Sequence, residues 1–180
     1  MTNRWNDKID IITNKFLQEF ETLNSEQLNR KPNSDSWSIA QNIDHLIVIN
    51  ESYFPIIQSI RNRTYKLPFI GRFGFLVNFL GKFILKSVQP DRKRKMKTFT
   101  MWEPSKSEIA DDILVRFQKH QTELKTLIDN CRDLLESGII ISSPVNKNIV
   151  YKLETAFDII VTHEQRHFEQ AREVLTLIRK

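Results

Sequence analysis

The chain has 180 residues, a net charge of +5, 40% hydrophobic residues and only four glycines and six prolines. This composition excludes a disordered or collagen-like chain and favours one helical domain spanning residues 1–180. The single cysteine, Cys131, excludes an internal disulfide and a cysteine-based zinc site. Its helical spacing with apolar neighbours predicts a packed thiol, with a lone nucleophile as the alternative. The charged first twenty residues predict no signal peptide and a cytoplasmic protein.

A helix over residues 3–23 is the first predicted element. Apolar residues recur in it every three or four positions and form one stripe: Trp5, Ile9, Ile12, Phe16, Phe20 and Leu23. A polar loop over residues 24–37 follows, with one helical turn expected at residues 25–28.

The second predicted helix begins after Ser38, because Ser38-Ile39-Ala40-Gln41 has the S-x-x-Q form of a capping box. Its apolar stripe again has helical spacing: Ile39, Ile43, Leu46, Ile49, Tyr53, Ile56 and Ile60. Pro55 is expected to kink this helix, since its ring clashes with the carbonyl four residues earlier. His45 lies one position off the stripe, on the same side as Gln41.

Residues 64–101 form an irregular insertion between the second and third helices. Its aromatic stretch, residues 69–85, is too short and too charged for a transmembrane span, so a helix lying across the bundle or a partner is expected. We expect six of its side chains to be buried against the bundle or a second subunit: Phe73, Phe75, Leu76, Phe79, Leu80 and Phe83. The basic run at residues 92–97 is typical of a solvated loop, with phosphate or lipid head-group contact as the alternative.

A third helix is predicted from Ser105 to Gly138, since Ser105-Lys106-Ser107-Glu108 also fits a capping box. His120 lies on its apolar stripe and is expected to be a core histidine or a cavity wall, with a fourth metal ligand as the alternative. After a loop with a short extended piece at residues 139–141, a fourth helix spans residues 152–178. Four long amphipathic helices predict an all-α four-helix bundle.

His163 and His167 lie four positions apart on the fourth helix, so they share one face and can chelate one metal ion. Residues 163–167 also fit the H-E-x-x-H pattern of zinc proteases. Only 13 residues follow His167, so no third ligand is expected downstream, and the protease interpretation is rejected. His45 on the second helix is the natural third ligand. The alternative is that these histidines lie on the helix surface, or are buried and satisfied by hydrogen bonds.

Two stretches carry a resemblance to a known family. One consists of Leu28, Pro32 and residues 37–46, and the other of residues 163–171. Together they resemble the DinB-like (DinB/YfiT-like) superfamily of metal-dependent bundle proteins over most of the chain. The resemblance implies a divalent metal ion on three histidines, which map onto His45, His163 and His167, and it implies a homodimer. Characterised relatives use the metal to activate a low-molecular-weight thiol, bacillithiol or mycothiol, for transfer or isomerisation.

Three neutral imidazoles leave coordination positions open, as a catalytic site requires, and a thiol bound to the metal would lose its proton. Gln41 and Gln170 lie one turn from His45 and His167, so we expect them to hold the ligand rings by hydrogen bonds. Glu164 lies about 100° around the helix from His163. It is a candidate to orient a ring or act as a base, although a solvated carboxylate is the favoured interpretation.

The favoured function is a metal-dependent enzyme, a thiol S-transferase or a hydrolase acting on a small molecule. Zinc or nickel is the favoured metal, with iron, manganese and copper as alternatives. The second hypothesis is a non-catalytic metal-binding bundle that acts in stress or interaction. The third is a basic membrane- or nucleic-acid-binding module, which rests only on the basic run and the aromatic stretch before it. We expect no nucleic-acid partner and no stable membrane insertion.

Overall fold

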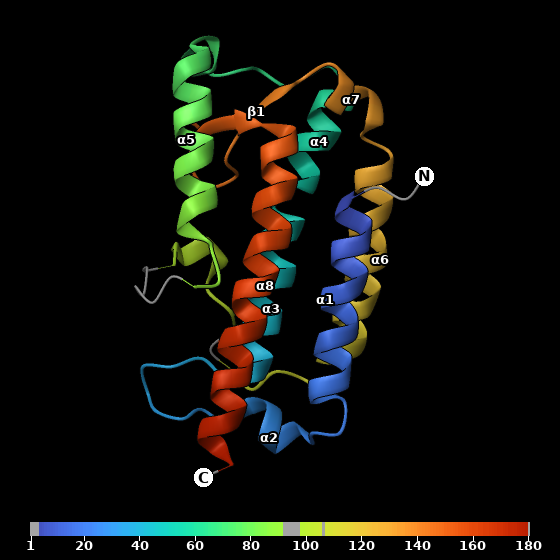
Figure 1. The fold of residues 1–180 in the computed structure, drawn as a ribbon, viewed down its shortest axis with the longest axis vertical. Coiled ribbons are helices and arrows are strands. Elements are labelled where there is room, and N and C mark those ends of the chain that lie inside the picture. The colour runs from blue at the N-terminus through green and yellow to red at the C-terminus, as the bar shows by residue number, and fades with distance from the viewer. Residues whose placement is uncertain (1–3, 92–97, 106, 180) are drawn as a thin grey trace.

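The computed structural model describes residues 4–91, 98–105 and 107–179, which are mostly helical (Figure 1). The helices are α1 (Arg4–Phe20), α2 (Ser25–Asn29), α3 (Ile39–Glu51), α4 (Phe54–Arg61), α5 (Gly74–Ser87), α6 (Ile113–Asp129), α7 (Arg132–Glu136) and α8 (Leu153–Ile178). Two 3-10 turns, η1 (Phe69–Arg72) and η2 (Thr100–Trp102), lie in the insertion. The strands β1 (Ile140–Ser142) and β2 (Val150–Lys152) form a small antiparallel sheet. The prediction of an all-α fold is confirmed in that the described residues are mostly helical, with only this small sheet.

The long helices pack against one another through the apolar stripes that the sequence predicts. Helix α1 lies against α6 and α8, and α3 lies against the same two helices. Phe16 and Phe20 of α1 are fully buried, and both rings contact Phe168 of α8, with centroids 5.2 and 6.1 Å apart. Figure 1 shows α3 directly behind α8, so side chains from these two helices meet in the interior.

The predicted start of α3 is confirmed. Ser38 Oγ accepts a hydrogen bond from the Gln41 amide, and Gln41 Oε1 accepts one from the Ser38 amide, at 3.1 and 3.2 Å. Pro55 does not kink one long helix as expected. The chain ends α3 at Glu51 and begins α4 at Phe54, so Pro55 lies in a first turn, where its missing N–H costs no hydrogen bond.

The predicted start of the third helix at Ser105 is wrong, because α6 begins only at Ile113. Long-range hydrogen bonds hold the preceding segment out of a helix. The Asp44 carboxylate accepts from the Ser105 amide at 3.2 Å, and the Asn29 side chain bonds both the amide and the carbonyl of Ile109 at 2.9 and 2.8 Å. Lys106 of the predicted capping box lies outside the described residues, as does Asn3 at the predicted start of α1.

The predicted stop at Gly138 is confirmed, with φ +64° in the left-handed region that favours glycine. The helix before it is interrupted between α6 and α7. The extended piece predicted at residues 139–141 corresponds to β1, whereas its partner β2 was not predicted. Ile141 pairs with Tyr151 across this sheet, and α8 then begins within one residue of the predicted position.

Helix α5 packs one of its sides against β2 and α8. Its Gly81 lies so close to them that a Cβ atom there would be 3.1 Å from Thr155 Cγ2 and 3.2 Å from Tyr151 Cβ. Val77, one turn earlier, is buried against the same surface. The close approach therefore depends on the absence of a side chain at residue 81.

The expected burial of the insertion's phenylalanines against the bundle is wrong. Exposed fractions are 39% for Phe73, 71% for Phe75, 64% for Phe79 and 54% for Phe83. The two leucines of the predicted set, Leu76 and Leu80, are half-buried. The buried side of α5 carries Val77, Gly81 and Ser87, and the phenyl rings lie on the other side. Their burial by a second subunit stays a prediction. The basic run at residues 92–97 lies outside the described residues. Among the helices that the structure describes, none is long and apolar enough to cross a membrane.

Replacing Gly81 with leucine is expected to destabilise the protein by about 1–3 kcal/mol, because the added side chain would separate α5 from α8. Gly74→Leu is the matched control, since a Cβ atom there meets nothing within 4 Å. The gain in helix propensity is larger at residue 81, in the interior of α5, than at residue 74, its first residue. A lower free energy of unfolding for Gly81→Leu than for Gly74→Leu, measured in urea, is therefore due to the close contact. Equal stabilities of the two variants would contradict this account of how α5 is held.

Candidate metal centre

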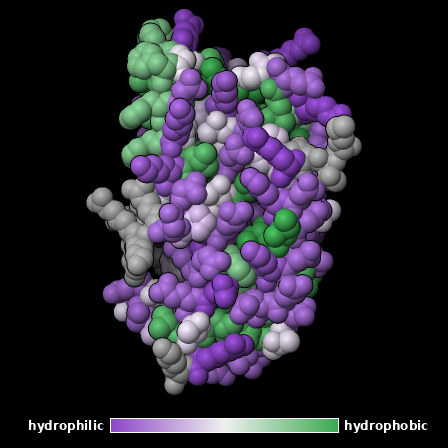
Figure 2. All heavy atoms as spheres, viewed as in Figure 1, coloured by the Kyte–Doolittle hydropathy of each residue, from purple (hydrophilic) through white to green (hydrophobic). Residues whose placement is uncertain are grey.

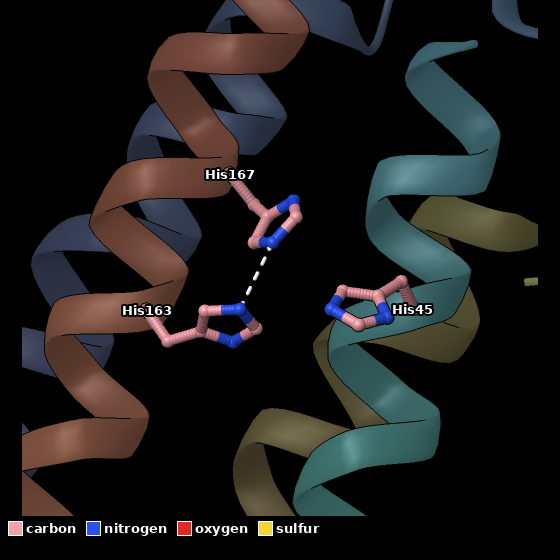
Figure 3. A group of neighbouring side chains, drawn as sticks. All are labelled: His45, His163 and His167. Atoms are coloured by element: carbon pink, nitrogen blue, oxygen red, sulfur yellow. Dashed lines mark hydrogen bonds between the residues drawn. The ribbon is translucent and has the colours of Figure 1, made fainter. Parts of the chain in front are cut away.

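Three histidines converge between α3 and α8 (Figure 3). His163 and His167 lie one turn apart on α8, and their Nε2 atoms are 3.0 Å apart. His45 faces them from α3, with its ring centroid 5.2 Å from that of His163 and 4.7 Å from that of His167. Each ring offers one nitrogen, and these three atoms all lie within 4.8 Å of one another.

Hydrogen bonds fix which nitrogen carries the proton in two of the three rings, His45 and His167. His45 Nδ1 lies 2.6 Å from the carbonyl oxygen of Trp102, which can only accept, so Nδ1 must donate. His167 Nδ1 lies 2.8 Å from Asn42 Oδ1. The Asn42 amide nitrogen already donates to the Ser38 carbonyl at 2.9 Å, so its oxygen faces the ring and accepts. His45 and His167 therefore both present an unprotonated Nε2 to the centre.

The three imidazoles are neutral at physiological pH. Burial lowers the pKa of His163 and His167 well below the usual value, and the neighbouring histidines and Arg166 lower both further. Burial also lowers the pKa of His45, although the Trp102 carbonyl and Asp44 oppose this. Neutral imidazole is the form that binds a metal ion. Since His167 Nε2 is unprotonated, His163 Nε2 donates the hydrogen bond between them, and its proton must move to Nδ1 before His163 can bind the ion through Nε2.

The geometry and the donor atoms fit a transition-metal ion. Two imidazole nitrogens on one tetrahedral zinc ion, each about 2.0–2.1 Å from it, are about 3.3 Å apart, and His163 and His167 are within a few tenths of an ångström of this. Nitrogen donors without a carboxylate suit zinc, nickel, copper or iron and do not suit magnesium or calcium. Among the residues that the structure describes, no other group of three His, Cys, Asp or Glu side chains comes together in this way.

The histidines form part of the wall of a cavity of about 840 Å³. Trp37 covers one side of it, and its ring stacks on His167 with centroids 5.9 Å apart. Arg166 lines the cavity and donates to the carbonyls of Ser87 and Gln89, at the end of α5. The volume lies within the range of small-molecule sites in proteins.

Two tyrosines also line this cavity. The hydroxyl groups of Tyr53 and Tyr151 are 2.9 Å apart, so one donates to the other. Burial raises the pKa of Tyr53 well above its usual value and raises that of Tyr151 to about 12. Both hydroxyls therefore keep their protons at neutral pH and remain hydrogen-bond donors.

Of the two glutamines predicted to hold the ligand rings, Gln41 is bonded elsewhere, and the role of Gln170 stays a prediction. Gln41 Oε1 accepts from the Ser38 amide, and Gln41 Nε2 donates to the Ser105 carbonyl at 2.9 Å, so this side chain holds the α3 cap and the insertion. Gln170 lines the cavity and is half-buried. Asn42 and Trp102 orient the rings instead.

Asn42 lies three residues before His45, on the same face of α3, so helical spacing could have identified it. The Trp102 carbonyl could not be found this way, because its position depends on the path of the insertion. Sequence reasoning also missed Trp37 as a cavity wall, although the residue was part of the family resemblance.

His120 and Glu164 lie away from the cavity wall, in the core. The His120 ring stacks on Phe54 with centroids 6.0 Å apart, which agrees with a core histidine and not with a fourth ligand. Glu164 is fully buried, so the favoured interpretation as a solvated carboxylate is wrong. Its Oε1 accepts from Asn50 Nδ2 at 2.8 Å, and it is not among the residues that line the cavity.

Cys131 is buried in the core, as its spacing predicted. Burial raises the pKa of its thiol to about 11, so it is protonated at neutral pH. A protonated buried thiol is a poor nucleophile. The packed-thiol interpretation is therefore the one that the structure supports.

Comparison with known proteins agrees with the geometry. A family model described as the DinB superfamily matches residues 9–171, which include all three histidines. No curated protein and no solved structure matched the chain.

Glu164 is expected to make stability depend on pH. Burial raises its pKa to about 7 in the folded protein, and the hydrogen bond from Asn50 opposes this. Between about pH 4.5 and 7 the folded state therefore binds more protons than the unfolded state, and stability falls as pH rises.

Relative to Glu164→Gln, the metal-free wild type should lose on the order of 2–3 kcal/mol of unfolding free energy across this window. The comparison cancels the other titrating groups. Urea unfolding of both proteins from pH 4 to 8 measures the difference. A difference that does not vary with pH would mean that Glu164 titrates normally in the fold.

Proposed function

Because the chain belongs to the DinB superfamily, we propose that it is a metal-dependent enzyme whose divalent ion is held by His45, His163 and His167. The observation that carries the proposal is the pair of hydrogen bonds from His45 Nδ1 and His167 Nδ1, which leave both Nε2 lone pairs facing His163. A bound divalent ion supplies Lewis acidity, and it lowers the pKa of a thiol or water that ligates it.

The favoured reaction is transfer of a low-molecular-weight thiol of the bacillithiol or mycothiol type, with hydrolysis of a small molecule as the second form. The cavity supports a polar small-molecule substrate, since Arg166 provides a fixed positive charge and the Tyr53–Tyr151 pair provides a hydroxyl donor. The Trp37 ring packs against the rings of His45 and His167, with centroids 4.9 and 5.9 Å away, and shields them from water on that side. Zinc or nickel is the favoured metal, because three imidazoles suit either.

The alternative is a non-catalytic metal-binding bundle that acts in stress or interaction. In an inert site, protein groups would fill the coordination positions that three histidines leave open. Among the described residues, His120 was the candidate for that role, and its ring stacks on Phe54 instead. The cavity beside the histidines also favours the enzyme.

The metal proposal predicts that alanine at any one of His45, His163 and His167 lowers the metal content of the purified protein. Wild type should hold about one equivalent of zinc or nickel after metal loading and desalting, and each variant well below half. Loading should raise the melting temperature of the wild type by linkage and leave that of the variants nearly unchanged.

His120→Ala is the matched control, because it removes a buried histidine from the same interior without touching the cluster. Its metal content should stay near one equivalent, measured by elemental analysis. Full occupancy in His45→Ala would remove the third ligand from the proposal. Equal loss of metal in His120→Ala would point to a global effect on folding.

We also propose that α1, α3, α6 and α8 form the four-helix bundle of the superfamily, and that the protein is a homodimer. The contacts of α1 and α3 with both α6 and α8 support the first part. The second part rests on the family. Light scattering at micromolar concentration should give twice the chain mass of 21.4 kDa, and a monomer mass would refute it.

A further inference from the structure

The outer side of α5 and the turn before it carry a group of exposed phenyl rings, which we call the α5 aromatic face. Its members are Phe69, Phe73, Phe75, Phe79 and Phe83. The rings of Phe69 and Phe73 are 5.3 Å apart, those of Phe73 and Phe75 are 6.4 Å apart, and Phe79 stacks on Phe83 at 6.5 Å. Figure 2 shows the hydrophobic side chains gathered over α5, with hydrophilic ones around them.

The packing of α5 holds this face outward. Val77 and Gly81 lie against β2 and α8, so the rings at residues 75, 79 and 83, each four residues apart, point away from the bundle. The C-terminal end is tied down, because Arg166 donates to the carbonyls of Ser87 and Gln89. The exposure of the rings is therefore a consequence of the fold.

The charge of this segment has one sign. Between Glu51 and Asp91 the sequence contains no aspartate or glutamate, whereas it contains six basic residues: Arg61, Arg63, Lys66, Arg72, Lys82 and Lys86. Arg61 forms an ion pair with Asp133 of α7, which offsets its charge. Arg72 lies over the Phe69 ring, 5.6 Å from its centroid, and Lys82 is exposed beside Phe79 and Phe83 on the next row of the helix. Basic side chains thus flank the phenyl rings.

We propose that the α5 aromatic face binds to the surface of an anionic phospholipid bilayer. Helix α5 lies in the plane of the interface with its phenyl rings at the boundary of the acyl chains. Arg72, in the turn η1 before the helix, and Lys82, on the side of the helix, extend to the lipid phosphates. The chain docks on one leaflet and does not span it.

The combination of rings and charge favours a bilayer over other partners. A second copy placed face to face would bring Arg72 and Lys82 of both chains together, in a segment without a carboxylate to pair with them. A nucleic acid would be met by projecting phenyl rings, with the cations at the margins. An anionic bilayer offers an apolar layer to the rings and phosphates to the flanking cations at the same time.

Docking would bring the bilayer close to the cavity. The side of α5 that faces the bundle contributes Ile84, Ser87 and Val88 to the cavity that contains the three histidines. The same helix therefore carries the proposed lipid contact on one side and a cavity wall on the other. Lipid binding itself does not depend on the metal proposal.

The test compares two double variants of the full chain by cosedimentation with vesicles of equal parts phosphatidylglycerol and phosphatidylcholine. Phe75→Glu with Phe79→Glu removes the centre of the aromatic face. Ile11→Glu with Val115→Glu, on α1 and α6, is the matched control, since both residues are exposed, at 57% and 67%, and the charge change is identical. Wild type and control should bind to these vesicles, and the variant with Phe75→Glu and Phe79→Glu should bind about tenfold or more weakly. Vesicles of pure phosphatidylcholine should bind much less wild-type protein than the anionic vesicles.

Circular dichroism establishes that each variant is folded. A second double variant, Arg72→Glu with Lys82→Glu, keeps every ring and should also bind more weakly to anionic vesicles. About 0.5 M salt should weaken wild-type binding.

The proposal is overturned if wild type does not sediment with anionic vesicles or if the aromatic variant binds as well as the control. It is also overturned if the aromatic variant only halves the mass in solution, which would assign the face to a second copy, or if wild type binds duplex DNA and no vesicles.

Discussion

The hydrogen bond from His167 Nδ1 to Asn42 Oδ1 is the constraint on which the candidate centre depends. It determines that the ring presents an unprotonated Nε2, and it holds only because the Asn42 amide nitrogen is committed to the Ser38 carbonyl. Ser38 is in turn the N-cap of α3. The residue that starts the helix therefore also sets the proton position on a histidine of another helix.

The insertion between α3 and α6 contributes to the cavity wall and carries the α5 aromatic face. Its 3-10 turn η2 provides the Trp102 carbonyl that orients His45, and Trp102 Nε1 donates to Ser52 Oγ, which fixes that turn on the end of α3. Its helix α5 provides one wall of the cavity and the exposed phenyl rings. A segment for which the sequence predicted no regular structure thus provides the backbone carbonyl that orients His45. The same segment also forms part of the cavity wall.

Helical periodicity and capping patterns predicted α1, α3 and α8 and the stop at Gly138, because these depend on neighbours within a few residues. The convergence of His45 with the α8 pair followed from the expected bundle and from the family resemblance. What failed depends on distant contacts. The Ser105 capping pattern does not start a helix, since Asp44 and Asn29 hold that segment by long-range hydrogen bonds. Glu164 is buried where α8 packs against α3, and Asn50 of α3 donates to it. The phenyl rings are exposed because the opposite side of α5 packs against β2 and α8. No local pattern contains this information.

The three-histidine centre can be tested by extended X-ray absorption fine structure at the zinc edge, on protein loaded with one equivalent of zinc. Three imidazole nitrogens are expected at about 2.0–2.1 Å, with the remaining coordination completed by a light atom from solvent. Addition of a low-molecular-weight thiol should then introduce one sulfur at about 2.3 Å while the three imidazoles remain. A spectrum with fewer than three imidazoles, or with the coordination completed by a sulfur before any thiol is added, would contradict the three-histidine centre.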